Sequence, residues 1–228
     1  MSQTALKMKK TAVRKRPGAG RPAACDVARR RRHLLDTAAK VFLEQGYKNA
    51  NVLEIANRAG ASKGTLYSCY PTKAELFVAV ITRKTHELQE SFAEVLVPGE
   101  PLEEVLERFG THLLRVMSHP EKLALYKLFI AEAPSFPRLA RKFWEAGPKR
   151  SMGMLGDYLR SHPEFKGDHP EYAAEMFWSL CCGQSLLRAQ LNNSYLMPRA
   201  AIGLNVKEAV HVFLNAYAEN RSPHRSRA

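Results

Sequence analysis

The segment from Gly60 to Leu76, GASKGTLYSCYPTKAEL, constrains the fold more than any other part of this chain. It is rich in small, hydroxylated and aromatic residues, and it lacks the wide apolar stripe through which most helices are stabilised by burial. Ser62 can cap a helix through its hydroxyl, and that helix must end at Pro71 because the residue before a proline avoids the helical region. The segment therefore predicts a short helix that is selected for its exposed surface.

Two capping boxes flank this short helix. Asn51 with Glu54 fits the start of the helix before it, and Thr72 with Glu75 fits the start of a long helix after it. Both pairs have the spacing at which two side chains satisfy the free N–H groups of a helix start. The sequence therefore predicts a short helix, a turn, a second short helix and a long helix in succession.

The remainder of the chain also has helical patterns. A first pattern begins at Leu34, and Gly46 lies where its C-terminal cap belongs. The sequence PGEP, residues 98–101, is the clearest internal boundary. Beyond it, apolar residues recur at helical spacing in the stretches 102–117, 123–131, 139–144, 152–159, 172–191 and 206–217. No segment requires a strand, so we predict an all-α fold.

The spacing around the short helix matches a helix-turn-helix. A small residue at Ala56 permits two helices to cross closely, Gly60 permits a sharp turn, and Leu66 anchors the second helix inward. The second helix of such a unit presents its N-terminal residues to base edges in the major groove of DNA. Lys63 and Thr65 are suitable donors for that role, and the small residues beside them let the helix backbone approach the DNA.

Charge and further side chains also favour a polyanionic partner. Tyr67 can reach a phosphate with its hydroxyl, and Lys73 starts the long helix, where backbone amides also favour phosphate. The formal net charge is +13, and residues 1–32 carry most of the excess. Such an arm gains DNA affinity because each neutralised phosphate releases counterions. The alternative is a solvated tail with no specific partner.

The arm contains RPGAGRP, residues 16–22, whose prolines and glycines exclude regular structure. Its Gly-Arg-Pro triplet resembles the minor-groove segment of AT-hook peptides, which makes Arg21 a candidate DNA contact. There is no second such repeat, and we favour an arm that adds affinity with little sequence preference.

Residues 32–77 resemble the DNA-binding headpiece of the TetR/AcrR family of bacterial transcriptional regulators. The resemblance is carried by IANRAGASKGTLYSCYPTKAELF, where the patterns Gly-x-Ser, Gly-Thr-Leu-Tyr and Lys-x-x-Leu are more specific than a general helix-turn-helix. The stretch EAPSFPRLARKFWEAGP, residues 132–148, looks like the AcrR-like C-terminal class.

The resemblance implies roles for single residues. It makes Asn51 a phosphate contact, it gives Tyr67 and Lys73 contacts to the DNA backbone, and it turns four residues of the short helix toward bases. Cys69 departs from the family pattern, which often has histidine or tyrosine there. The candidate DNA contacts are Arg21, Asn51, Ser62, Lys63, Gly64, Thr65, Tyr67, Ser68 and Lys73.

One short recognition helix buries too little surface for useful specificity, so we expect a homodimer on a palindromic operator in double-stranded DNA. The resemblance assigns dimerisation to the helices at about 172–191 and 206–217, as a four-helix bundle. We expect a disordered basic arm at 1–28, a helix-turn-helix domain at 29–72, a linking helix four at 73–97, an effector-binding and dimerisation domain at 98–220 and a tail at 221–228.

The central helices carry aromatic residues that could line an apolar pocket for a small-molecule effector. Packing in the core is the alternative role for most of them. A ligand there can act only by favouring one separation of the two headpieces, with helix four as the lever. The candidate ligand contacts are Tyr126, Phe129, Phe143, Trp144, Met152 and Trp178, with Gln184 or Arg188 orienting a polar group.

Other functions find little support in the sequence. The four cysteines are too scattered for a disulfide scaffold; we expect Cys181 and Cys182 in the core, and Cys69 is at most a redox sensor. The His-Pro-Glu triplets at 119–121, 162–164 and 169–171 read as helix starts and not as a metal site. No catalytic constellation and no apolar run of about 20 residues occurs, so we expect no enzyme, no cofactor, no membrane partner and a cytoplasmic protein.

The sequence thus predicts a ligand-responsive, dimeric transcriptional repressor that a small, largely apolar ligand releases from its operator. A non-specific architectural DNA-binding protein is the alternative, since it would use the same basic arm without preferring a palindrome. A helical enzyme or lipid-binding module would bind its ligand without DNA, and the specific headpiece argues against it.

Overall fold

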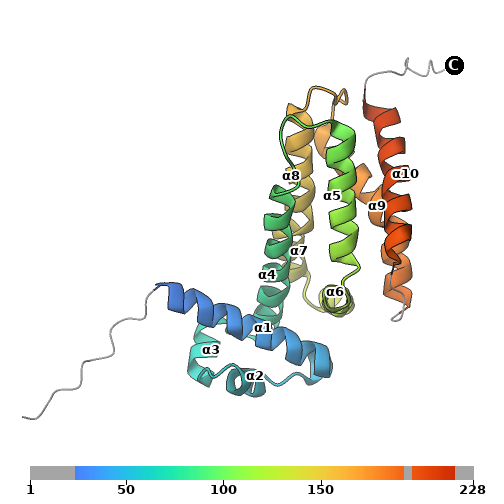
Figure 1. Cartoon of the computed structure of the whole chain (residues 1–228). Helices are drawn as coiled ribbons and strands as arrows, with labels where there is room; N and C mark the ends of the chain where they lie inside the picture. Colours follow the sequence, from blue (N-terminus) through green and yellow to red (C-terminus); the bar gives the residue numbers. More distant parts are fainter. Residues whose placement is uncertain (1–23, 193–196, 219–228) are drawn as a thin grey trace, which may run out of the picture.

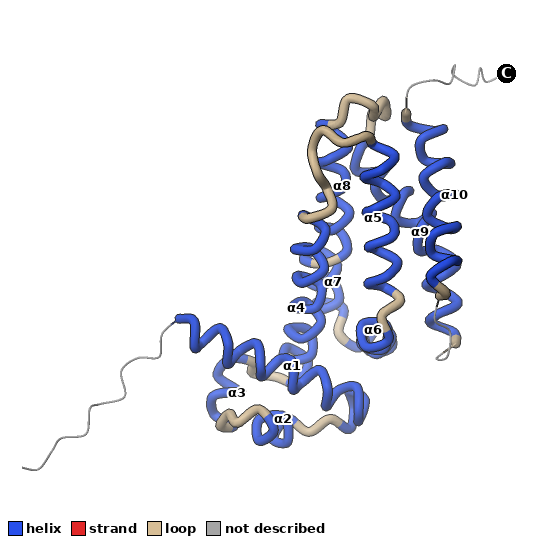
Figure 2. The backbone as a smooth tube through the Cα atoms, viewed as in Figure 1, coloured by secondary structure: helices blue, strands red, loops and turns tan. Residues whose placement is uncertain are grey.

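The computed structural model describes residues 24–192 and 197–218, and these residues form the predicted all-α fold (Figures 1 and 2). The N-terminal helices are α1 (Ala24–Asn49), α2 (Val52–Arg58), α3 (Lys63–Cys69) and α4 (Lys73–Ala93). They are followed by α5 (Leu102–Met117), α6 (Pro120–Glu132), the short 3-10 helix η1 (Ala133–Ser135), α7 (Pro137–Ala146), α8 (Pro148–Ser161), α9 (Pro170–Leu191) and α10 (Arg199–Tyr217).

The start of α1 corrects one expectation. Because α1 begins at Ala24, the prediction of irregular chain up to residue 28 is wrong over residues 24–28. The predicted stop at Gly46 is confirmed, since its φ of 73° breaks α1 there before the last turn to Asn49. The part of the arm before residue 24, which includes Arg21, and the tail at 221–228 lie outside the described residues.

The capping box predicted at Thr72 is confirmed, and the one predicted at Asn51 is confirmed only in part. The Thr72–Glu75 capping box is complete. Asn51 caps α2 by accepting a hydrogen bond from the Leu53 N–H at 2.8 Å, but Glu54 does not complete a second box. Its carboxylate instead pairs with Arg58 and accepts a hydrogen bond from the Gln45 side chain of α1.

Two of the three His-Pro-Glu triplets start a helix as predicted, and the third does not. His119 and His169 precede α6 and α9, with proline in the first helical position, as predicted. His162 is different, because it follows the end of α8 and its Nε2 lies 3.0 Å from the Glu100 carbonyl oxygen. Among the described residues no three potential ligands are placed to hold a metal ion.

The helices α1 to α4 form a headpiece whose core continues into α6 and α7. The Phe42 and Phe77 rings lie 4.8 Å apart between their centroids, inside the headpiece. Phe77 is 6.3 Å from Phe129 of α6, which is 4.4 Å from Phe143 of α7. The apolar core therefore crosses the boundary between the headpiece and the rest of the protein.

A second core holds α5 against α9 and α10. Phe177 of α9 lies 6.3 Å from Phe109 of α5 and 5.3 Å from Phe213 of α10. The helices approach closely at Gly110, where an added Cβ would lie 3.0 Å from Val206 Cγ1. The α10 helix lies on the side of this domain away from α4 (Figure 1). In the described part of the chain, no helix is both long and apolar enough to cross a membrane.

Cys181 and Cys182 lie in this second core, as predicted. Burial raises the pKa of the Cys182 thiol to about 12, and burial also raises the pKa of Cys181. Both thiols are therefore protonated near neutral pH, where they behave as small apolar side chains.

Candidate DNA-binding surface and effector cavity

The α3 helix is exposed around most of its circumference. Of its seven residues only Leu66 is buried, and this side chain belongs to the headpiece core. Gly64 is open to its surroundings, because an added Cβ would approach nothing closer than the Ser62 Oγ, at 3.9 Å. A helix that buries one side chain while its start stays accessible suits insertion into a groove of DNA.

The hydroxyl groups of this helix are positioned by hydrogen bonds within it. Ser62 Oγ accepts from the Thr65 N–H at 3.0 Å and also lies 2.8 Å from Thr65 Oγ1. The Ser68 hydroxyl donates to the Thr65 carbonyl oxygen at 2.9 Å. Lys63 Nζ lies 5.9 Å from the centre of the Tyr67 ring, so these two exposed side chains share one face. The predicted base-facing residues are thus brought together on one short helix.

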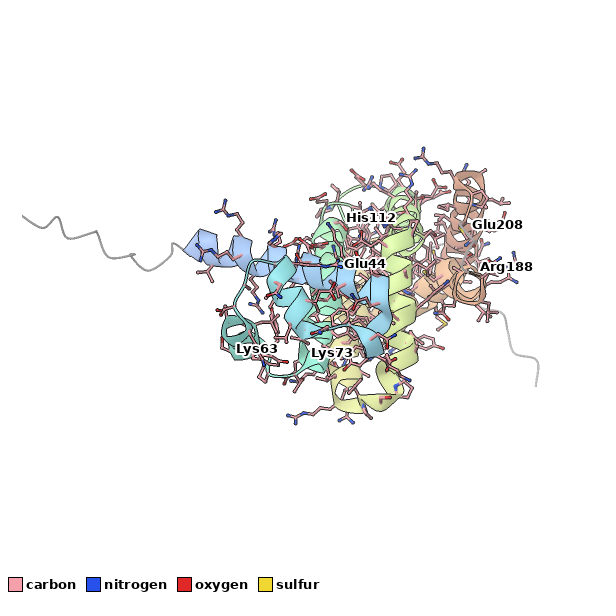
Figure 3. The ribbon with its side chains drawn as sticks, turned by 90° about the horizontal axis from the view of Figure 1, so that it is seen from below. Glu44, Lys63, Lys73, His112, Arg188 and Glu208 are labelled. Atoms are coloured by element: carbon pink, nitrogen blue, oxygen red, sulfur yellow. The ribbon has the colours of Figure 1, made fainter. Side chains whose placement is uncertain are left out.

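Lys73 has a different environment from Lys63, although Figure 3 shows both on the headpiece. Lys73 Nζ donates hydrogen bonds to the carbonyl oxygens of Lys48 at 2.8 Å and Ala50 at 3.3 Å. It also lies 4.9 Å from the centre of the Tyr47 ring. Its ammonium therefore binds the carbonyl end of α1 in this structure, and the backbone N–H groups at the start of α4 are the groups at this position that suit a phosphate.

The basic run at the start of α1 contains a contact that sequence reasoning missed. Arg31 Nε donates to the Tyr70 hydroxyl at 3.1 Å, and the guanidinium carbon lies 6.0 Å from the centre of that ring. This hydrogen bond, which the Tyr70 hydroxyl oxygen accepts, is the main reason why the pKa of Arg31 is raised. Arg31 thus joins α1 to the end of the recognition helix. The run of arginines at 29–32 is evident in the sequence. The contact was missed because it depends on these residues being helical, which directs Arg31 toward Tyr70.

An apolar cavity of about 520 Å³ lies among the six helices from α4 to α9. All six aromatic and methionine side chains predicted for the pocket line it: Tyr126, Phe129, Phe143, Trp144, Met152 and Trp178. Gln184 and Arg188 do not line it. Both are exposed. At 100° per residue, Gln184 lies about 240° and Arg188 about 280° around α9 from Trp178. Figure 3 shows Arg188 with Glu208 of α10 on the side away from the recognition helix.

The polar groups of the cavity come from residues that the sequence did not single out. Two lysines, Lys84 of α4 and Lys122 of α6, line it together with Glu175 of α9. Burial is the main reason why the pKa of Lys122 is lowered and the pKa of the Tyr126 hydroxyl is raised. Lys84, Lys122 and Glu175 were missed because nothing in the local sequence distinguishes a charged residue beside a cavity from one on a solvated surface.

Charged residues also connect α4 to α1 beside this cavity. Arg83 Nη1 lies 2.9 Å from Asp36 Oδ1 of α1 and donates to the Arg32 carbonyl oxygen at 2.7 Å. Lys84 Nζ lies 3.5 Å from the same Asp36 oxygen and 3.7 Å from Glu87. Asp36 is therefore shared by a cavity-lining lysine and by the arginine next to it.

A buried amide connects α4 to the opposite wall of the cavity. Gln89 Nε2 donates to the carbonyl oxygens of Ala146 at 2.7 Å and Gly147 at 3.2 Å, where α7 ends and α8 begins. Gly147 is tightly packed there, since an added Cβ would lie 2.9 Å from Thr85 Cγ2 of α4. The long α4 helix thus contacts both α1 and the α7–α8 junction.

An exposed recognition helix on a helix-turn-helix headpiece, joined to a helical domain with an internal cavity, defines a DNA-binding transcriptional regulator. Comparison with known families gives the particular class. Residues 34–80 match the family described as bacterial regulatory proteins of the tetR family, and residues 104–219 match the C-terminal domain of AefR-like transcriptional repressors. The chain belongs to the TetR family of transcriptional regulators.

Individual relatives agree with this assignment. The chain is 42% identical over 67 residues to the transcriptional activator FasR of Mycolicibacterium smegmatis, a match that covers 29% of this chain and 31% of FasR. The flavonoid-responsive regulator FrrA is 30% identical, with a TM-score of 0.68 over 85% of this chain and 100% of FrrA. A regulator from Mesorhizobium loti assigned to the TetR family is 26% identical, with a TM-score of 0.78 over 84% and 98% of the two chains.

Proposed function

We propose that this regulator is a dimeric repressor that leaves a palindromic operator when a small, largely apolar ligand enters the cavity. The observation that carries the proposal is the double role of Phe129 and Phe143, which line the cavity and also belong to the headpiece core. A ligand that displaces these rings changes the packing under α1 and α4. The repressor description of the C-terminal family and the flavonoid response in the name of FrrA support the direction of this control.

We propose the exposed apolar side chains of α9 and α10 as the dimer interface. Leu187 and Leu191 are 54% and 81% exposed on α9, and Leu204 and Val212 are 64% and 49% exposed on α10. Large apolar side chains gathered on two long neighbouring helices suit an interface that a second copy buries. Two copies related by a twofold axis would present two α3 helices to successive half-sites.

Contacts between α1 and α4 support a division of the chain into domains. We propose that residues 29–72 act as the DNA-binding domain, residues 73–97 as the link and residues 98–220 as the effector and dimerisation domain. The Arg83 and Lys84 pairs with Asp36 hold α4 to α1 in this arrangement. A ligand shifts the equilibrium between two headpiece separations only by its difference in affinity for the two states.

The deciding experiment is selection of bound sequences from random duplex DNA by the full-length protein, at two salt concentrations. We expect an enriched palindrome that survives the higher salt, because contacts to base edges add to the salt-sensitive phosphate contacts. Binding that disappears with salt and enriches no motif would reject the operator and favour the architectural alternative. Transcription from a promoter that carries the selected site then separates repression from activation.

A further inference from the structure

We propose that the cavity selects an amphipathic anion, a carboxylate attached to an apolar chain or ring system, through Lys122 and Tyr126. The inference rests on the proposed effector function and adds the chemical class of the ligand. It starts from the polar atoms that an otherwise apolar cavity brings together on α6.

Lys122 and Tyr126 are four residues apart on α6, and both line the cavity. Side chains at this spacing lie one turn apart on the same helical face, which allows an ammonium and a phenol hydroxyl to bind one carboxylate. Among the described residues, neither Lys122 nor Tyr126 has a hydrogen bond or an ion pair of its own. Both groups therefore remain able to donate to a ligand.

The other lysine of the cavity is in a different position. Lys84 lies 3.5 Å from Asp36, 3.7 Å from Glu87 and 4.0 Å from Glu121, so three carboxylates balance its charge. Among the described residues, Lys122 has no carboxylate at ion-pair distance. Glu87 and Glu121 favour its charge from farther away, but burial outweighs them, and its pKa is lowered. A ligand carboxylate would place a negative charge in direct contact with this ammonium, whereas a neutral ligand would leave it beside apolar groups.

The rest of the cavity suits the apolar part of such a ligand. Phe129, Phe143 and Met152 line it together with both tryptophans of the chain, Trp144 and Trp178. Its volume of about 520 Å³ is in the range of sites that enclose a small molecule, roughly 300–1,000 Å³. The cavity also has a carboxylate, Glu175 of α9, but that residue is exposed and forms no ion pair with Lys122.

The test compares dodecanoate with dodecanol, two probes with the same chain and different head groups. Because Trp144 and Trp178 both line the cavity, the change in the protein's own tryptophan fluorescence during a titration reports occupancy. At neutral pH, below the concentration at which dodecanoate forms micelles, we expect the full-length protein to bind dodecanoate about tenfold more tightly than dodecanol, as expected for one charge-assisted contact. Lys122→Met should remove this advantage and leave dodecanol binding unchanged.

Two further variants separate the charge from general damage to the fold. Lys122→Arg should retain the preference for dodecanoate. Lys142→Met, the same change at an exposed α7 position that does not line the cavity, should bind like the unmodified protein. Equal affinities for the two probes, a preference that survives Lys122→Met, or no binding of either probe would each overturn the anionic ligand class. The operator selection described above is independent of these titrations, so the proposed regulator could stand while this inference fails.

Discussion

Lys73→Met distinguishes the role that the family resemblance implies for this lysine from the role that the structure shows. The substitution removes charged hydrogen bonds to the carbonyl oxygens of Lys48 and Ala50 and a contact with the Tyr47 ring. A hydrogen bond to a charged group contributes about 1.5–3 kcal/mol and an exposed cation–π contact about 0.5–1 kcal/mol. Since Lys73 is half-buried and water can replace part of these contacts, we expect a loss of about 2 kcal/mol in the free energy of unfolding.

The assay is urea unfolding at one fixed protein concentration, because a dimer's stability depends on concentration. An unchanged slope with a lower midpoint would report a true loss of stability. Lys63→Met is the matched control, since Lys63 is exposed and lies beside the Tyr67 ring. It should leave the midpoint unchanged, weaken binding to the selected operator and, if Lys63 neutralises a phosphate, reduce the salt slope of binding by about one.

The opposite pattern would refute this reasoning. If Lys73→Met kept the urea midpoint of the unmodified protein and reduced the salt slope of DNA binding, its ammonium would be a phosphate contact. The hydrogen bonds to the carbonyl oxygens at the end of α1 would then contribute little to stability.

Three other predictions follow from single sites. Burial, followed by the charge of Lys122, lowers the pKa of His112. Below the ordinary histidine pKa of 6.5, the unfolded chain therefore binds more protons than the folded protein, so the free energy of unfolding is retained above that pH and falls on acidification. This fall should be less steep in His112→Gln when unfolding is measured from pH 8 to 5. Leu187→Arg should convert dimers into monomers in sedimentation velocity, and an unaltered dimer would reject the α9–α10 interface. Gly110→Ala should lower the free energy of unfolding by about 1–3 kcal/mol in thermal or urea unfolding, because the added Cβ would lie 3.0 Å from Val206 Cγ1. Gly153→Ala is the control: the space around Gly153 is open, and this variant should not be destabilised.

The headpiece could be predicted in detail because its signals are local. The caps at Ser62 and Thr72 and the helix break at Gly46 depend on residues within a few positions of each other, and each was recognised from the sequence. The error at Glu54 has a long-range cause. Its carboxylate is bound by Gln45 of the preceding helix as well as by Arg58, and a capping motif read along one segment does not reveal such competition.

The cavity shows the same division between local and long-range information. The aromatic residues of the central helices were recognised as a set because apolar character is a property of composition. Lys122 was missed because its importance depends on how α1, α4 and α6 pack. In that packing Lys84 is in direct contact with Asp36, while the carboxylates near Lys122 remain beyond ion-pair distance. Gln184 was misplaced for a geometric reason, since polarity does not tell which side of α9 faces the cavity.

The contacts that join the cavity to the headpiece differ in strength, and this difference predicts how the response should depend on salt. The ion pairs of Asp36 with Arg83 and Lys84 are partly exposed, and such pairs contribute about 0.2–1 kcal/mol each. Phe129 is buried in the shared core, where truncation of a phenylalanine costs about 3–5 kcal/mol. Aromatic packing should therefore carry most of the coupling between ligand and headpiece. Because salt screens exposed charges and leaves apolar packing almost unchanged, operator affinity should fall steeply with salt, while the factor by which a ligand weakens that affinity should change little.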